Sequence, residues 1–346
     1  SYQTISTELE LRKQAEERLV IAYKDIEKRV EERTAELTKT NEQLRQEITQ
    51  RKRAEEALRN SKATLELAGE IERRGFTGIY CPSTVANVTL CAALAQATNE
   101  IHFGTSIAPI YARTVLDYAQ TVSFIHEISG GRFRFGIGVS HGPSLKRMKV
   151  TAGKPLSDTR EFVADLKAIE RVGELPPIIL ATMRRKMIAL AGEIGDGMVF
   201  ANASRSFMKT SLAALPDDKR KDENFYIGNM IPTCISDDIE AAKAVNRRTL
   251  TSYAQLPNYR NYWKESGYEE EMAGVEAAMA AGEPDKVGDH LSDKWLADNT
   301  LFGNVSQVRE GLEAWFDTGV RTPILVPSSA NGNQLVAFEE IFAAFS

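Results

Sequence analysis

The chain has 346 residues, 42% of them hydrophobic and 26% charged, which gives enough apolar mass for one large domain or two ordinary ones and excludes a disordered chain. The net charge is −5, and because residues 1–60 balance 13 basic against 13 acidic side chains, the acidic excess belongs to the rest. A mildly acidic chain without a basic arm has no electrostatic footprint for a phosphate backbone, so nucleic acid is not an expected partner.

Cysteine usage and hydropathy narrow the expected environment of the chain. Its three cysteines, Cys81, Cys91 and Cys234, are odd in number and lack the spacing of metal ligands. We therefore expect small buried thiols, no metal site and a reducing compartment. No stretch approaches the roughly 18 apolar residues of a membrane span, and the N-terminus is charged where a signal peptide is apolar. These features predict a cytoplasmic protein without a membrane partner.

The N-terminal segment differs from the rest, because all 23 glycines and 12 prolines lie at or after Gly69. Within this segment, eight of ten positions spaced seven residues apart are apolar or aromatic, which predicts a coiled-coil helix over residues 1–60. The ten positions are Tyr2, Leu9, Glu16, Tyr23, Val30, Leu37, Leu44, Arg51, Leu58 and Leu65.

The second set of heptad positions is mixed in polarity. It contains the apolar Val20 and Ile48 and the polar Glu27, Thr34, Asn41 and Glu55. A buried Asn41 amide is satisfied best by its symmetry mate, which favours a parallel dimer, and a single solvated helix is the alternative. The segment VEERTAELTKTNEQLRQEITQRKRAEEALRN (30–60) resembles the signalling helix of bacterial sensor histidine kinases, which implies a parallel dimeric connector without implying kinase activity.

After the N-terminal helix, short apolar runs alternate with amphipathic stretches, a pattern typical of a parallel sheet with crossover helices. The candidate strands are residues 78–81, 101–107, 132–138, 177–182, 197–202, 225–232 and 323–327. The candidate helices are residues 61–74, 86–99, 114–128, 157–171, 184–194, 236–255 and 304–318. The pattern therefore predicts an α/β domain over residues 61–346.

Four blocks in this domain match one known family in order. They are GFTGIYCPS, LAALAQATNEIHFGTSIAPIYARTVLDYAQTVSFIHEISGGRFRFGIGVSHGP, PPIILATMRRKMIALAGEIGDGMVFAN and VSQVREGLEAWFDTGVRTPILVPS. Together they resemble the luciferase-like flavin- and deazaflavin-dependent oxidoreductases, whose fold is a (β/α)8 TIM barrel. The resemblance begins near residue 62, where the N-terminal helix takes the place of the family's first strand. We therefore expect a barrel that lacks this strand and leaves strands 78–81 and 323–327 with unpaired edges.

Ligands of such barrels bind at the C-terminal ends of the strands. The resemblance places a cis peptide bond at Ser106-Ile107, beneath a flavin ring. Gly136 and Gly138 share one face of their strand, which lets a ring or a backbone approach closely. The resemblance also places Ser140 and His141 over the cofactor pocket, where a histidine could contact the ring or carry a proton.

A second group of candidates follows the strand at 177–182. Thr182, Arg184 and Arg185 precede a predicted helix, whose free N–H groups and nearby guanidinium groups suit a cofactor phosphate. The sequence reads Cys81-Pro82-Ser83 where many relatives carry an acidic residue or histidine, which removes one acid/base candidate. Three aromatic residues of the segment after 225–232 are candidates for a lid: Tyr259, Tyr262 and Trp263.

The resemblance implies an oxidoreductase that transfers a hydride to or from a small organic substrate, or oxygenates it. The implied cofactor is a deazaflavin of the F420 type, which the SHGP turn favours, or FMN. The alternative is a catalytically impaired, truncated barrel that serves as a coiled-coil dimerisation or signalling protein. The sequence does not identify the substrate.

Overall fold

The computed structural model describes residues 2–84 and 86–345. It divides into two compact units, residues 1–64 and residues 65–346. Among the described residues, no helix is long and apolar enough to cross a membrane.

Helix α1 (Tyr2–Arg73) contains the whole predicted heptad pattern, so the prediction of a long helix is confirmed. The side chains of Tyr2, Leu9, Arg51 and Leu58 lie outside the described part of the structure. The described heptad residues Tyr23, Val30, Leu37 and Leu44 are exposed by 72%, 59%, 57% and 49%. A row of exposed apolar side chains leaves the predicted pairing of two such helices untested.

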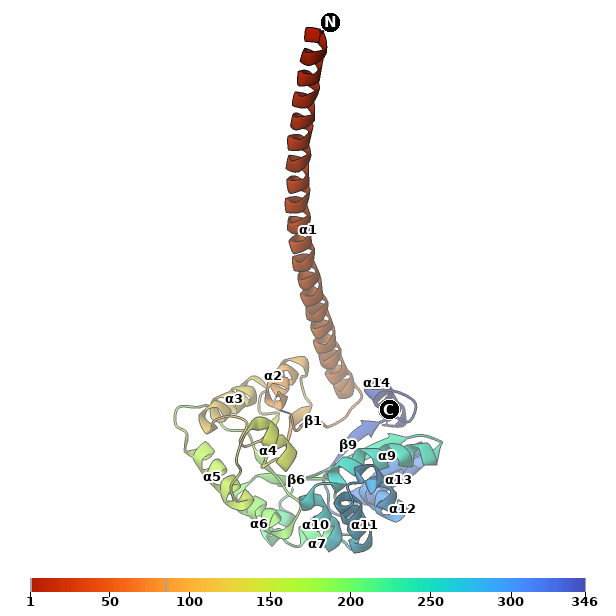
Figure 1. Ribbon diagram of the computed structural model, residues 1–346. Coiled ribbons are helices and arrows are strands. Elements are labelled where there is room, and N and C mark those ends of the chain that lie inside the picture. Colours follow the sequence, from red (N-terminus) through yellow and green to blue (C-terminus); the bar gives the residue numbers. More distant parts are fainter. Residues whose placement is uncertain (1, 85, 346) are drawn as a thin grey trace. The chain divides into compact units, whose positions relative to one another are not determined.

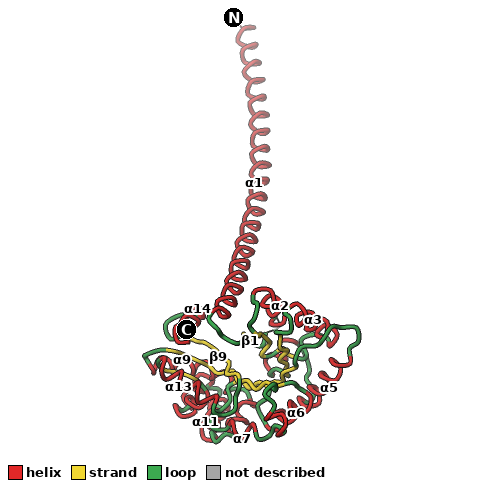
Figure 2. Tube along the Cα trace, turned by 180° about the vertical axis from the view of Figure 1, so that it is seen from behind, coloured by secondary structure: helices red, strands yellow, loops and turns green. Residues whose placement is uncertain are grey.

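The second unit contains a parallel sheet surrounded by helices, with the strands gathered at its centre (Figures 1 and 2). The strands are β1 (Gly78–Pro82), β2 (His102–Ser106), β3 (Ala108–Pro109), β4 (Phe133–Gly138), β5 (Ile178–Ala181), β6 (Gly197–Ala201), β7 (Tyr226–Ile235), β8 (Leu301–Gly303) and β9 (Thr322–Ser328). All seven predicted strands are present, and β7 runs on to Ile235. The short strands β3 and β8 were not predicted, because two or three residues carry no readable periodicity.

The sheet is an almost closed barrel with one open side. Its order is β1-β2-β4-β5-β6-β7-β8, with β3 paired to β4 and β9 paired to β7. Within the described residues, β1 pairs only with β2, and β9 pairs only with β7. The expected barrel without its first strand is therefore confirmed. Both open strands contain proline, which cannot donate a backbone hydrogen bond to an added strand.

The helices of the second unit follow the strands and cover the sheet (Figure 1). Five of them fall within predicted helices or close to their bounds: α2 (Asn87–Ala97), α3 (Val115–Ile128), α6 (Arg185–Ile194), α9 (Ile239–Ala254) and α13 (Val305–Phe316). A sixth, α5 (Pro155–Ala168), is shifted toward the N-terminus. The structure adds α4 (Gly142–Met148), α7 (Met208–Leu212), α8 (Asp217–Lys221), α10 (Pro257–Glu265), α11 (Glu269–Ala280), the 3₁₀ helix η1 (Pro284–His290), α12 (Asp293–Asn299) and α14 (Gln334–Phe345).

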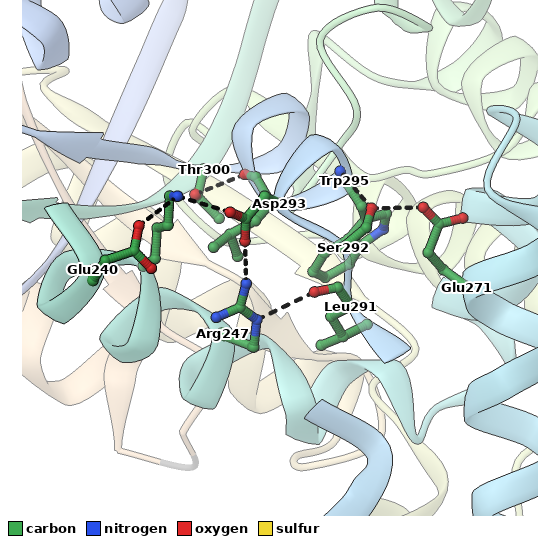
Figure 3. Close-up of polar contacts among 10 residues, drawn as sticks. Glu240, Arg247, Glu271, Leu291, Ser292, Asp293, Trp295 and Thr300 are labelled. Carbon is green, nitrogen blue, oxygen red and sulfur yellow. Dashed lines mark hydrogen bonds and ion pairs between the residues drawn. The ribbon is translucent and has the colours of Figure 1, made fainter. Parts of the chain in front are cut away.

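A polar cluster fixes the helices between β7 and β8 (Figure 3). The Asp293 carboxylate of α12 accepts hydrogen bonds from Lys243 at 2.7 Å and Arg247 at 2.5 Å, both on α9. The Ser292 hydroxyl caps α12 at the Trp295 N–H and donates to Glu271 of α11 at 2.6 Å. These contacts join three helices that periodicity alone does not connect.

Candidate active site

The end of β2 has the backbone geometry that the resemblance implies. The peptide bond between Ser106 and Ile107 is cis, and β3 follows it directly. Two glycines of β4 make room for this bulge. A Cβ on Gly136 would lie 1.9 Å from the Thr105 carbonyl oxygen, and a Cβ on Gly138 would lie 2.9 Å from the Ile107 Cδ1. The close approach at both glycines is thus made by β2 and Ile107.

Asn87, the first residue of α2, ties the bulge to the neighbouring strand. Its buried Nδ2 donates to the Ile107 carbonyl at 3.0 Å and to the Pro82 carbonyl at 3.1 Å. Across the barrel, the Ser106 hydroxyl lies 3.1 Å from the Met230 sulfur of β7. The bulge is therefore held from both sides by contacts that were not predicted.

The turn after β4 presents Ser140 and His141 at the same end of the barrel. Ser140 has a left-handed φ of 64°, which directs the chain away from the strand. The His141 ring lies 5.6 Å from the Tyr259 ring, centroid to centroid. Burial lowers the pKa of His141 below its ordinary value of 6.5, so the imidazole is neutral at pH 7.

Two buried polar groups without hydrogen-bond partners among the described residues lie at the ends of β5 and β6. Thr182 and Asn202 are 2% and 4% exposed, yet the Thr182 Oγ1 and the Asn202 Nδ2 have no hydrogen-bond partner among the described residues. Asn229 of the adjacent strand β7 is fully buried and also has an unpartnered Nδ2. Buried polar groups are rarely left unpaired, so these three atoms suit a bound polar ligand.

The two arginines after β5 differ in their surroundings. Arg184 donates to the Glu265 carboxylate of α10 through its Nε at 2.7 Å and also through its Nη2. Arg184 is therefore paired with a carboxylate in this structure, and the expectation that it helps to hold a cofactor phosphate stays a prediction. Arg185 begins α6 and is exposed, with no ion pair among the described residues.

Helix α10 connects the ends of three strands. Its Tyr259 contacts His141 after β4, its Glu265 pairs with Arg184 after β5, and its Trp263 Nε1 donates to the Asn202 carbonyl after β6 at 3.2 Å. The expectation that these aromatic residues line a lid stays a prediction, and in this structure Trp263 and Tyr262 are fully buried and Tyr259 is 4% exposed. The side chains pack into the core because α10 turns its aromatic face toward the barrel.

The residues at this end fit a planar cofactor. Burial raises the pKa of Tyr253 and Tyr259 above the ordinary value, so both hydroxyls stay protonated, and His141 is neutral. These three rings are therefore uncharged, the ion pair of Arg184 and Glu265 lies at the same end, and the ends of β5 and β6 offer unpaired polar atoms. No cluster of three or more metal-ligating side chains occurs among the described residues.

Sequence reasoning missed several residues of the site. Asn229 left a readable signal, because it is a polar residue within the apolar run of β7. Asn87 left none, since an asparagine at a helix start is common. Glu265 lies 81 positions from Arg184, a separation at which one sequence gives no sign of contact.

The fold is an α/β barrel of parallel strands, and the candidate site residues lie at the C-terminal ends of these strands. The sequence profile of the luciferase-like monooxygenase family matches residues 37–322, and the chain belongs to this family. The expected family and enzyme class are thereby confirmed.

Three known proteins illustrate the likeness. A Mycobacterium tuberculosis protein named as a coenzyme F420-dependent oxidoreductase is 25% identical over 77% of this chain and 90% of its own. The F420-dependent tetrahydromethanopterin reductase of Methanopyrus kandleri has a similar fold, with a TM-score of 0.67, 14% identity and coverage of 82% and 94% of the two chains.

The third is the oxygenating constituent of 3,6-diketocamphane monooxygenase from Pseudomonas putida, solved in complex with FMN. Its TM-score is 0.55 at 14% identity, covering 84% of this chain and 92% of that one. The names of these relatives support the two expected cofactors, a deazaflavin of the F420 type or FMN.

Proposed function

We propose that this chain binds a deazaflavin of the F420 type, or FMN, at the C-terminal ends of β2, β4, β5 and β6 and transfers a hydride to or from a small organic substrate. The observation that carries the proposal is the pair of buried, unpartnered polar atoms on Thr182 and Asn202, beside a bulge that two glycines accommodate. When bound, the cofactor supplies the hydride chemistry.

In this proposal, residues of the chain bind, orient and shield the cofactor. Thr182 and Asn202 give hydrogen bonds to polar atoms of the cofactor, and the exposed Arg185 attracts its phosphate at the start of α6. Ile107, on the bulge, supports the ring from below. His141, whose imidazole is neutral at pH 7, accepts or donates one proton at an imidazole nitrogen as the substrate reacts.

A binding measurement tests this proposal. The purified chain is mixed separately with F420 and with FMN, and binding is followed by fluorescence quenching and by co-elution in gel filtration. We expect one of the two cofactors to bind, and we expect F420 to bind more tightly. Binding of neither cofactor overturns the proposal and favours the alternative of an impaired barrel that acts as a dimerisation module.

Substitution of Thr182 shows whether the cofactor occupies the proposed position. Thr182→Val keeps the volume of the side chain and removes its hydroxyl, so cofactor affinity falls about fivefold, as for one lost hydrogen bond. Thr159→Val on α5 is the matched control, because Thr159 is equally buried at 2% and its hydroxyl donates to the Pro155 carbonyl of its own helix. Equal affinities of the two variants place the cofactor elsewhere.

We also propose that residues 1–60 form a parallel dimer through the heptad face of α1. The support is the row of exposed apolar residues at Tyr23, Val30, Leu37 and Leu44, with Asn41 between the last two. Light scattering at micromolar concentration should give the mass of a dimer, and Asn41→Leu should shift the oligomeric state. A monomeric mass contradicts the proposal.

A further inference from the structure

A concavity lies at the opposite end of the barrel from the candidate active site. It has a volume of about 500 Å³ and is lined by the start of β7, by α7 and α8, and by the turn from α13 into β9. Since these strands are parallel, the start of β7 lies at the N-terminal end of the sheet. A cavity of this volume is within the usual range for small-molecule sites.

The polar lining of this cavity carries only positive charge. Three cationic side chains line it, Lys209, Arg220 and Arg321, and no carboxylate does. Arg321 is fixed by backbone carbonyls, because its guanidinium donates to Phe225 at 2.7 Å and to Arg220 at 2.8 Å. Its charge is therefore oriented by hydrogen bonds and is not neutralised by an ion pair among the described residues.

The two other cations are weakly compensated. Arg220 pairs with Asp217, whose side chain is 73% exposed, so water competes strongly for that carboxylate. Lys209 on α7 is exposed and has no ion pair among the described residues. The cavity thus presents an excess of positive charge on a chain whose net charge is −5.

The remaining walls are apolar. Leu212 and Ile227 form buried walls at 5% and 1% exposure, and Phe316 at the rim is 44% exposed. Gly319 has a left-handed φ of 99° in the adjoining turn, and a Cβ there would lie 2.9 Å from Leu212 Cδ1. A side chain at this position would therefore crowd the wall at Leu212.

Because the cavity combines apolar walls with cationic side chains, we propose that it binds an amphiphilic anion, namely a carboxylate with an apolar tail of several carbons. The carboxylate lies between Lys209 and Arg321, where it forms charge-assisted hydrogen bonds. The tail lies against Phe316, Leu212 and Ile227, where each buried methylene adds to affinity. This site is separate from the proposed cofactor site and does not depend on it.

Titration calorimetry with decanoate, below its micellar concentration, tests the proposal on the full chain. We expect decanoate and decyl sulfate to bind one site per chain, and acetate and decyltrimethylammonium not to bind. Lys209→Glu should weaken decanoate binding at least tenfold, and Phe316→Ser should weaken it several-fold.

Lys221→Glu is the matched control, since Lys221 is exposed at the end of α8 and does not line the cavity. It changes the net charge as Lys209→Glu does, so it should leave decanoate binding within twofold of the parent. Absence of decanoate binding overturns the proposal. Binding that survives both Lys209→Glu and Phe316→Ser also overturns it, because the amphiphile then lies on another surface, such as the exposed face of α1.

Discussion

At the scale of single residues, the lowered pKa of His141 predicts how stability and activity depend on pH. Burial lowers its pKa below 6.5, so the folded protein holds the neutral imidazole that the unfolded chain protonates at pH 6.5 and below. Stability from this group is therefore complete above pH 6.5 and is lost as pH falls through the folded pKa. We expect kcat/KM, measured where the protein remains folded, to decline as pH falls through the folded pKa of His141, which lies below 6.5.

His141→Gln should lower activity and flatten that acidic limb. His102→Gln is the control, because burial and the nearby Arg134 also lower the pKa of His102, but His102 begins β2 at the far end of the barrel. If the acidic limb of the pH profile disappears in His102→Gln and persists in His141→Gln, the titrating group is His102, and the prediction for His141 is wrong.

A second prediction concerns Gly136, which lies against the backbone of the neighbouring strand. An alanine Cβ at this position would lie 1.9 Å from the Thr105 carbonyl oxygen, and backbone cannot swing away as a side chain does. Gly136→Ala should lower the free energy of unfolding by about 3 kcal/mol or more, at the upper end of overpacking effects. Gly142→Ala, where a Cβ meets nothing within 4 Å, should be close to neutral in the same denaturant titration.

At the scale of elements, the last turn of α1 is fixed to the loop before β2. The Glu72 carboxylate accepts hydrogen bonds from the N–H groups of Asn99, Glu100 and Ile101 at 2.7 to 3.1 Å. Burial raises the pKa of Glu72, but these N–H groups lower it by more, so the net direction is downward. This carboxylate stabilises the fold above its ordinary pKa of 4.5, and the effect is lost as pH falls through the folded value.

Glu72→Gln should therefore lower the free energy of unfolding by about 1 kcal/mol at pH 7, since a neutral amide oxygen is a weaker acceptor than a carboxylate. The difference between variant and parent should shrink in denaturant titrations at pH 4 and below. Glu100→Gln, on the same loop, is an exposed control and should leave stability unchanged. A difference that is independent of pH would show that the charge of Glu72 does not matter.

The sequence predicts best those elements whose packing requires a regular pattern of apolar residues. The strands read clearly because a barrel buries both faces of a strand, and runs such as IIL in β5 are then continuously apolar. Helix α10 was missed because PNYRNYWKE places Arg260 and Lys264 among its aromatic residues. Arg260 is nevertheless buried, with its Nη1 donating to the Ala254 carbonyl at 2.9 Å, a contact that composition does not reveal.

The candidate site was predictable in position and only partly in its contacts. The rule that ligands bind where parallel strands end locates Ser106, His141 and Thr182 without a structure. The pairing of Arg184 with Glu265 depends on where α10 crosses the barrel, which is a property of tertiary packing. Local sequence therefore predicts which strand ends form the candidate site, while the fold decides which of their side chains remain available to a ligand.

At the scale of the whole molecule, the open side of the barrel should govern local stability. Strands β5 and β6 are paired on both sides, whereas β1 and β9 are each paired on one side among the described residues. Every residue of β9 is partly exposed, and in β1 only Cys81 is fully buried. Strands with one partner and incomplete burial open at lower free energy than the central strands.

Hydrogen exchange should follow this arrangement. Amides of Ile79 and Leu325 should exchange faster than those of Leu180 and Val199, by roughly tenfold for each 1.4 kcal/mol of difference in opening free energy. Pro323 and Pro327 of β9 are left out of the comparison because proline carries no amide hydrogen. Equal protection of all four amides would mean that the barrel opens only as a unit, with its incomplete side as stable as its centre.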